Sequence, residues 1–375
     1  MSAASRKPLF RADHVGSLLR PPELLEARAS WKSGAMSAAA LREVEDAAIA
    51  DAVRLQEDLG LESVTDGEFR RENWWIDFIS AIEGIEISSP DEAAGFRKAP
   101  GTASGYVPKN VRVAGRLGRK GDIQAADFAF LNGQTSKTAK VTIPSPTRVH
   151  FHGGDASVDD AAYPDKDAFW DDLARIWRDE IAALEALGCR YIQIDDPVIN
   201  YFVDTRMRDN LRAIGEDPDT LIHRYARLLN DCISGRGPET YLTIHLCRGN
   251  AQSAWIAEGG YEPLAEALFP VVGVDAWFLE YDDARSGGFE PLRFMPDDGC
   301  VVLGLVTTKR GDMEDRDGLR RRIDEAARYV PLDRLGLSPQ CGFASVDLGN
   351  LIALQDQAAK LSLVIDLARE VWGEA

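Results

Sequence analysis

The sequence predicts an α/β chain folded as a single (β/α)8 TIM barrel, and three observations support this expectation. Short apolar runs alternate with longer amphipathic stretches along the 375 residues, which is the pattern of repeated βα units around a parallel sheet. Eight such runs occur, which is the strand number of this barrel. Polar, reactive side chains gather at the C-terminal ends of the runs, where the loops of a TIM barrel build the active site.

The expected strands and helices follow from these runs in chain order. The strands are predicted at residues 10–17, 61–68, 138–146, 191–196, 241–247, 274–280, 300–307 and 334–341. Helices are predicted at 38–59, 167–187, 219–233, 251–268, 315–328 and 347–371. Gly60 and Gly188 follow the first two helices, as expected because glycine commonly ends a helix.

One segment, residues 84–137, interrupts the alternation of strands and helices. Its KNVRVAGRLGRKGDIQAADFAFLNG stretch has alternating patterns and glycine turns, which predicts a β-hairpin inserted between the second and third strands. We therefore expect residues 1–375 to form one barrel domain that carries this insertion.

Composition and charge exclude several function classes. The chain has 43 Lys and Arg against 61 Asp and Glu, a net charge of −18, which argues against nucleic acid and anionic membranes as partners. No apolar run is long enough to span a bilayer, and the first residues lack an apolar signal core, so we expect a cytoplasmic protein. Five widely spaced cysteines, an odd number, do not suggest a disulfide framework, which leaves reduced thiols as candidate ligands.

Four side chains at three strand ends form a candidate metal site. His245 and Cys247 lie two residues apart in YLTIHLC and therefore point the same way from a strand. Glu280 ends the apolar run VDAWFLE, and Cys341 ends RLGLSPQC. Two thiolates, an imidazole and a carboxylate favour zinc, and their dispersion along the chain favours a catalytic over a structural site. The alternatives are a buried histidine and core cysteine, and a Glu280 that faces solvent.

Six motifs resemble one enzyme family. HVGSLLRP, TDGEFRREN, YIQIDDP, IHLCRGN, FLEYDDARSG and LSPQCGFAS extend from His14 to Ser345. Together they resemble the catalytic C-terminal half of cobalamin-independent methionine synthase, and more closely its short, single-barrel bacterial homologues.

This resemblance implies a zinc-dependent thiol methyltransferase that moves a methyl group from a methyltetrahydrofolate to the zinc-bound thiolate of homocysteine, giving methionine. It places zinc on His245, Cys247, Glu280 and Cys341, and the amino-acid pocket on Ser17, Glu68 and Asp195. Two carboxylates and a hydroxyl suit the ammonium group of homocysteine.

Each pocket residue also has a simpler interpretation from sequence. Ser17 follows Gly16 and could be a turn residue. Glu68 could form a salt bridge with Arg70 or Arg71. The Asp195–Asp196–Pro197 sequence could cap a helix.

The chain departs from the family pattern in ways that affect the methyl donor. The long N-terminal half of the full-length synthase is absent, and the DEP motif is DDP, with Asp196 in place of Glu. His152 stands where the family has an aromatic residue that stacks on the pterin, and Lys309 where it has a histidine. An amine leaving group needs a general acid, and His14, His150, His152 and Lys309 are the candidates. The zinc and thiol half of the site matches the family better than the folate half.

Other functions remain open from the sequence. An alkyltransferase similar to the epoxyalkane–coenzyme M transferases would use another thiol, but an acceptor without an amine has no use for Glu68 and Asp195. The metal-free porphyrinogen decarboxylases share this fold yet need no soft metal ligands. A zinc store or sensor is a further alternative. The sequence does not indicate an oligomeric state.

Overall fold

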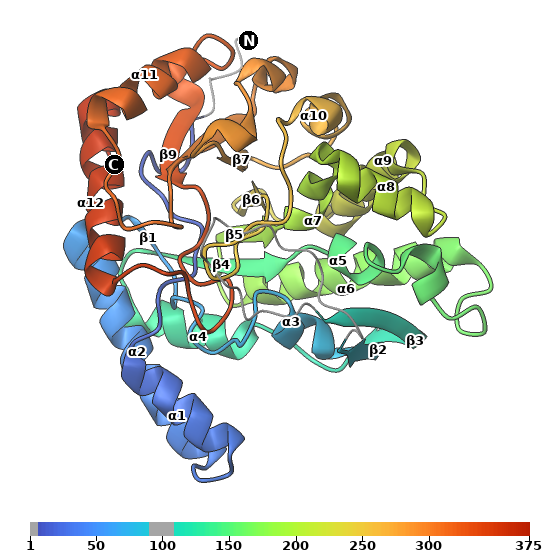
Figure 1. Ribbon diagram of the computed structural model, residues 1–375. Coiled ribbons are helices and arrows are strands. Elements are labelled where there is room, and N and C mark those ends of the chain that lie inside the picture. The colour runs from blue at the N-terminus through green and yellow to red at the C-terminus, as the bar shows by residue number, and fades with distance from the viewer. Residues whose placement is uncertain (1–6, 90–108) are drawn as a thin grey trace.

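The computed structural model describes residues 7–89 and 109–375. Its centre is a seven-stranded parallel sheet in the order β1-β4-β5-β6-β7-β8-β9, a curled α/β architecture consistent with a TIM-like barrel (Figure 1). The strands are β1 (Ser63–Val64), β4 (Thr138–Pro144), β5 (Tyr191–Asp195), β6 (Tyr241–Leu246), β7 (Ala276–Glu280), β8 (Cys300–Val306) and β9 (Leu335–Pro339).

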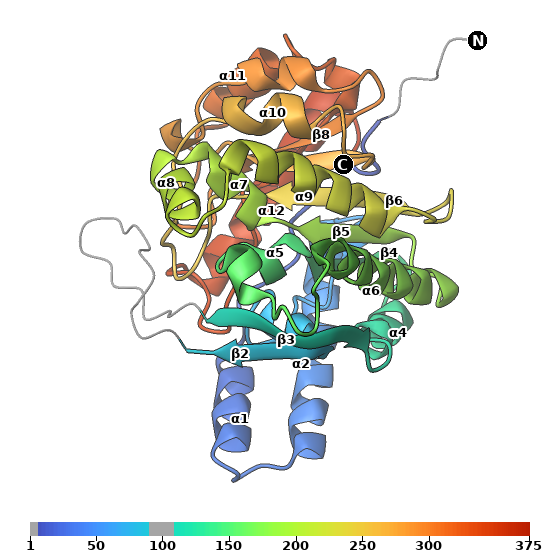
Figure 2. The same cartoon turned by 90° about the vertical axis from the view of Figure 1, so that its right-hand side faces the viewer.

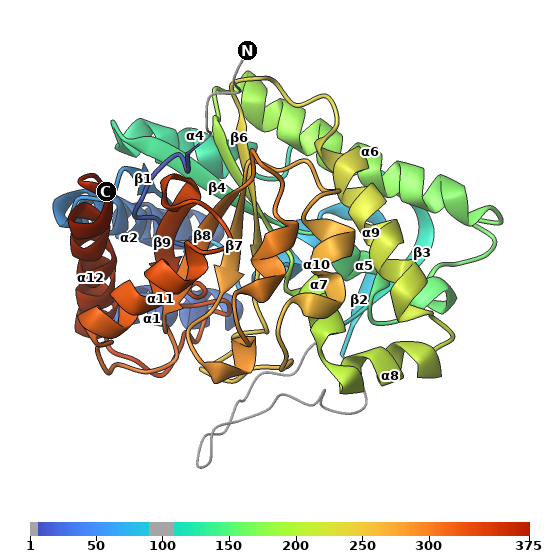
Figure 3. The ribbon, with the colours of Figure 1, turned by 90° about the horizontal axis from the view of Figure 1, so that it is seen from above.

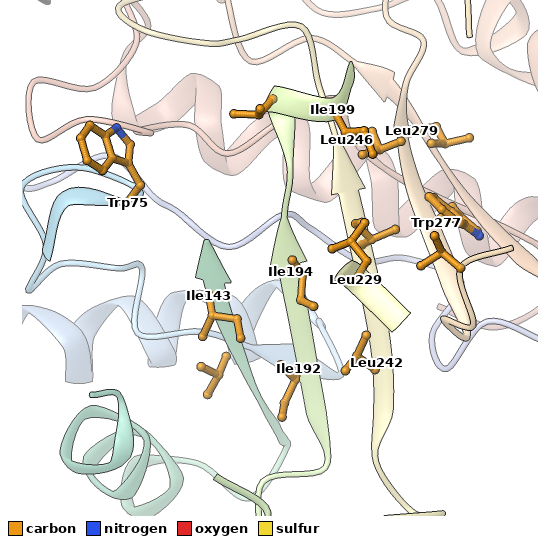
Figure 4. Close-up of a cluster of buried hydrophobic side chains, with 14 of the residues drawn as sticks. Trp75, Ile143, Ile192, Ile194, Ile199, Leu229, Leu242, Leu246, Trp277 and Leu279 are labelled. Atoms are coloured by element: carbon orange, nitrogen blue, oxygen red, sulfur yellow. The ribbon is translucent and has the colours of Figure 1, made fainter. Parts of the chain in front are cut away.

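Side chains alternate between the two faces of each strand, and the two faces differ in chemistry. The outer face is aliphatic and aromatic, with side chains such as Ile194, Leu242 and Trp277 (Figure 4). The inner face carries polar groups such as Gln193 and Thr243 above a small apolar cluster around Phe278. Successive side chains of a strand point to opposite faces of the sheet. A side chain that points inward at the C-terminal end of a strand therefore faces the open end of the curled sheet.

Helices cover the outer face, as the βα pattern predicts. In Figure 3, α6, α9 and α10 lie on one side of the strands and α11 and α12 on the other. The longer helices are α1 (Pro22–Lys32), α2 (Ala38–Leu59), α4 (Ala125–Gln134), α6 (Lys166–Ala186), α9 (Pro218–Ile233), α11 (Arg316–Ala326) and α12 (Leu354–Trp372). The shorter ones are α3 (Ile76–Ser80), α5 (Thr147–His150), α7 (Pro197–Asn200), α8 (Thr205–Ala213) and α10 (Glu262–Leu268).

The first expected strand, 10–17, is not a regular strand, so the prediction of eight strands is wrong at this position. The segment makes one parallel bridge to β9, between Ala12 and Leu337. On the β1 side its contacts run through side chains: the Ser63 hydroxyl donates to the Asp13 carboxylate at 2.7 Å, and the Thr65 hydroxyl donates to the Gly16 carbonyl at 2.7 Å. On the β1 side, side-chain hydrogen bonds take the place of a backbone ladder. The segment therefore has the apolar pattern of a strand without the regular backbone hydrogen bonds of one.

The predicted hairpin is present as β2 (Ile82–Ser88) paired antiparallel with β3 (Asn110–Arg119). In Figure 2 this pair crosses in front of α2, and α1 and α2 project below it; Figure 1 shows that the pair lies beside α3, on the opposite side of the molecule from α2. Residues 90–108 of the predicted insertion lie outside the described residues. The helix α4 completes the interval before β4.

Two helix predictions need correction. The helix expected at 251–268 begins only at Glu262, because Gly259 and Gly260 and a bridge between Ala251 and Ala254 precede it. The helix expected from 347 begins at Leu354. By contrast, α2 ends where predicted, with Gly60 in the left-handed region at φ 97°. Within the described residues, no helix is both long and apolar enough to cross a membrane.

Candidate metal and substrate site

Three of the four predicted metal ligands converge. His245 ends the inner face of β6, Cys247 follows it by two residues, and Cys341 lies in the loop after β9. Their ligand atoms all lie within 4.8 Å of one another, and all three side chains are buried. One imidazole and two thiols in this arrangement fit zinc.

Glu280, the fourth predicted ligand, lies next to this group but does not join it. Its carboxylate is fully buried, which contradicts a solvent-facing side chain. Oε2 accepts a hydrogen bond from the Arg248 backbone N–H at 2.6 Å, and Oε1 lies 3.3 Å from Lys309 Nζ. The structure therefore shows Glu280 in a salt bridge with Lys309.

The two thiols of this group are electrostatically unequal. A hydrogen bond from Cys247 lowers the pKa of Cys341 well below its ordinary value, and the adjacent His245 and Lys309 act the same way against the effect of burial. The same hydrogen bond, followed by burial, raises the pKa of Cys247. Although burial opposes it, the hydrogen bond and charge of Cys341 raise the pKa of His245. Cys341 is therefore the thiol that ionises first.

A cavity of about 230 Å³ opens beside these ligands. Its wall includes His245, Cys247 and Cys341 together with the three predicted pocket residues, Ser17, Glu68 and Asp195. These six residues come from five separate segments of the chain and meet at the carboxyl ends of the strands, which is where this architecture places its active sites.

Ser17 and Glu68 are held in place by their neighbours. The Ser17 hydroxyl accepts a hydrogen bond from Ala344 N–H at 3.2 Å. Glu68 has φ 59°, in the left-handed region that non-glycine residues seldom occupy, and such strain is typical of functional sites. Its carboxylate accepts from the Thr142 hydroxyl at 2.6 Å and pairs with Arg71, so the salt bridge considered from sequence exists within the cavity wall.

The consecutive aspartates Asp195 and Asp196 have different roles: one lines the cavity and the other caps a helix. Asp195 pairs in register with His245 across β5 and β6 and lines the cavity. Gln193 donates to its Oδ1 at 2.7 Å, and burial raises its pKa. Asp196 instead caps α7 by accepting from Ile199 N–H at 2.9 Å. The capping interpretation is therefore correct for Asp196, whereas Asp195 faces the cavity.

The general-acid candidates fall in different places. His152 lines the cavity, and Lys309 lies behind the ligand group, where it pairs with Glu280 and, at 3.6 Å, with Asp282. His14 does not line the cavity; burial, followed by the charge of Lys140, lowers its pKa to about 4. His150 is buried outside the cavity wall, with Nδ1 3.0 Å from the Tyr225 hydroxyl.

Three arginines line the same cavity: Arg71, which the sequence suggested only as a salt-bridge partner of Glu68, and Arg148 and Arg206, to which the sequence assigned no role. The guanidinium of Arg148 lies 3.8 Å from the centre of the Trp75 ring. Arg148 lies in α5, after β4, and Arg206 lies in α8, after β5, and no local pattern marks either arginine as site-facing.

Comparison with known proteins shows the family to which the chain belongs. Residues 10–358 match the family model described as the catalytic domain of cobalamin-independent synthase. An uncharacterized protein of Bacillus subtilis, YxjH, is 42% identical over 98% of this chain and 96% of its own length. The 5-methyltetrahydropteroyltriglutamate–homocysteine methyltransferase of Ralstonia pickettii is 25% identical over 89% of this chain, which spans only 39% of that enzyme.

Two solved structures extend the comparison. One, from Listeria monocytogenes, is assigned as a vitamin-B12-independent methionine synthase; it is 33% identical, with a TM-score of 0.76 over 99% of this chain and all of its own. The other, a B12-independent methionine synthase from Shewanella sp. W3-18-1 in complex with selenomethionine, is 20% identical, with a TM-score of 0.66 over 99% of this chain and 96% of its own. At that identity the second similarity supports the fold alone.

Proposed function

Because the chain belongs to the family of cobalamin-independent methionine synthase catalytic domains, we propose that it is a zinc-dependent methyltransferase that methylates the thiol of homocysteine. The observation that carries this proposal is the meeting of His245, Cys247 and Cys341 with Ser17, Glu68 and Asp195 around one cavity. We further propose that residues 1–375 form one barrel domain with the insertion at 84–137, and that segment 10–17 occupies the position of the eighth strand of this barrel.

The metal would be held by His245, Cys247 and Cys341, with Glu280 as the fourth ligand once it leaves Lys309. A bound zinc ion lowers the pKa of an incoming thiol and so supplies a nucleophile at neutral pH. The negative charges of Glu68 and Asp195 suit an ammonium group on the molecule that carries this thiol, at the end away from the sulfur. This pairing of a soft metal site with an acidic pocket fits an amino acid that carries a thiol.

The chain's own residues then orient the acceptor and exclude water. Asp195 is fixed by Gln193, and Glu68 by Thr142 and Arg71, so both carboxylates meet the substrate in preset positions. Trp74 and Trp75 line the cavity and cover part of its wall. Of the general-acid candidates, His152 is the histidine that lines the cavity. Burial, followed by the charge of Arg148, lowers its pKa well below the ordinary value, so we propose that the neutral imidazole hydrogen-bonds the leaving nitrogen of the donor and is not itself the source of the proton.

The methyl donor is proposed to be a 5-methyltetrahydrofolate, as for the larger relatives. The alternative is an alkyltransferase that uses another thiol or donor. The acidic pocket favours homocysteine, since a thiol without an amine would bring no cation to Glu68 and Asp195, whose partners in the protein are Thr142 and Arg71 for the first and Gln193 for the second.

The test is a donor and acceptor screen on zinc-loaded protein, with products identified by mass spectrometry. Methyltetrahydrofolate mono- and triglutamate, S-methyl sulfonium compounds and epoxides are each combined with homocysteine and with a thiol that lacks the amine. Transfer to homocysteine supports the proposal. Transfer only to the amine-free thiol would overturn it in favour of the alternative.

A further inference from the structure

A second group of metal-binding side chains lies outside the cavity wall. His150 at the end of α5, Asp155 in the turn that follows and Glu216 between α8 and α9 place their ligand atoms within 4.8 Å of one another. His150 Nε2 lies 3.1 Å from Asp155 Oδ1 and 3.7 Å from Glu216 Oε1. Donors around a tetrahedral zinc ion, at bonds of about 2.0–2.1 Å, lie roughly 3.3–3.4 Å apart, which falls between these two separations.

We propose that His150, Asp155 and Glu216 bind a divalent transition-metal cation of the zinc, cobalt or manganese class, separately from the thiol-containing site. An imidazole with two carboxylates is a hard-to-borderline donor set, unlike the two sulfurs in the cavity. The two sites would therefore differ in metal preference.

The imidazole is already oriented as a metal ligand requires. The Tyr225 hydroxyl lies 3.0 Å from Nδ1, so Nε2 is the nitrogen directed at the two carboxylates. Such a hydrogen bond on the second ring nitrogen is the usual support of a ligating histidine. The ring is buried against Trp170, with the ring centres 4.7 Å apart, which fixes its plane.

The backbone is shaped around the Glu216 carboxylate. Gly154 has φ 57°, and a Cβ there would lie 2.6 Å from Glu216 Oε1. The Asp155 backbone N–H donates to the same oxygen at 2.8 Å. Glycine at this position thus lets the carboxylate approach the turn that carries Asp155.

Charge balance also favours a cation. Neither Asp155 nor Glu216 forms an ion pair with a lysine or arginine of residues 7–89 or 109–375, although both contact the same imidazole. The more distant Arg224 and Lys166 offset part of the negative charge of Asp155, and a divalent ion would neutralise the rest where the two carboxylates meet the imidazole. The Asp155 side chain is 45% exposed, which provides an entry path and room for a water ligand.

The cation would join two loops that flank the cavity. The turn with Asp155 begins just after His152, and Glu216 follows α8, which contributes Asn210; both His152 and Asn210 line the cavity. Binding would therefore hold these two walls together without touching the substrate.

The experiment separates the two sites by substitution. Cys247→Ser/Cys341→Ser protein, stripped of metal, is titrated with Zn²⁺, Co²⁺ and Mn²⁺ by calorimetry, and its bound metal is counted after gel filtration. We expect one equivalent to remain, a Co²⁺ spectrum without thiolate charge-transfer bands, and a rise in Tm with metal. Adding Asp155→Asn and Glu216→Gln should weaken binding at least tenfold.

Asp160→Asn is the matched control, because Asp160 is a nearby carboxylate that pairs with Lys166 on the surface. It should leave binding unchanged. If the double-cysteine variant does not fold, wild-type protein holding one equivalent of zinc is titrated with Mn²⁺ and followed by electron paramagnetic resonance. No binding above the Asp155→Asn/Glu216→Gln background would overturn the proposal and identify the group as a hydrogen-bond network only.

Discussion

Replacing Lys309 by methionine should strengthen metal binding. In the structure Lys309 Nζ lies 3.3 Å from Glu280 Oε1, so a metal that recruits Glu280 must first break this charged hydrogen bond. Such a bond contributes about 1.5–3 kcal/mol. Its loss should therefore raise zinc affinity roughly 10- to 100-fold, and removal of a positive charge beside the metal acts in the same direction.

The variant is expected to stay folded, because a second cation remains beside both carboxylates. Arg285 Nη2 lies 3.7 Å from Glu280 Oε1 and 3.8 Å from Asp282 Oδ1. Methionine is unbranched and flexible, so it can fill the space of the lysine stem. Circular dichroism checks that the fold is retained.

The assay is competition for zinc against a chromophoric chelator, with apoprotein of each variant. Lys309→Arg retains the charge and should bind zinc close to the wild-type level. Lys137→Met removes a lysine that pairs with Glu62 at 2.7 Å, far along the strand from the site, and should have no effect. Equal or weaker zinc binding by Lys309→Met, in folded protein, would refute the reasoning and leave Glu280 outside the metal's coordination.

Three further predictions concern the same site. Cys247→Ser should lose the bound zinc measured by mass spectrometry while circular dichroism stays unchanged; global unfolding would instead indicate a structural metal. Asp195→Asn should raise KM for homocysteine by tenfold or more and leave KM for an amine-free thiol unchanged; an equal change in both would count against an ammonium pocket. Burial raises the pKa of Asp196 to about 6 from 3.8, so the folded state binds this proton more tightly than the unfolded chain, and stability falls as pH rises from about 4 to about 6. That rise in pKa corresponds to roughly 3 kcal/mol, and Asp196→Asn should remove this part of the pH slope in denaturant titrations; an unchanged slope would contradict it.

The strand ends were the part of the site that could be read from the sequence. His245 and Cys247 share a face because a strand has a period of two, and the same rule places Asp195 toward the cavity. The predicted strands from 138 onward correspond to β4–β9, since each is a continuous apolar run buried on the sheet. Local pattern is sufficient where one element alone decides which way a side chain points.

The contacts between distant segments could not be read in this way. The Lys309–Glu280 pair joins the loop after β8 to the end of β7, and nothing in either motif shows that the lysine meets the carboxylate. Segment 10–17 has the composition of a strand, yet its partners on the β1 side are the side chains of Ser63 and Thr65. Such pairings depend on the assembled barrel and leave no periodic signal in the sequence.

The irregular segment 10–17 has a thermodynamic consequence for substrate recognition. It closes the gap between β9 and β1 with few backbone bonds, and it is also the segment that presents Ser17. A molecule that contacts Ser17 and Cys341 together would therefore span the junction at which segment 10–17 is joined to β9 by one parallel bridge. Binding at this junction would add contacts between the two edges of the sheet, so a ligand that reaches both residues is expected to stabilise the folded protein as well as occupy the pocket.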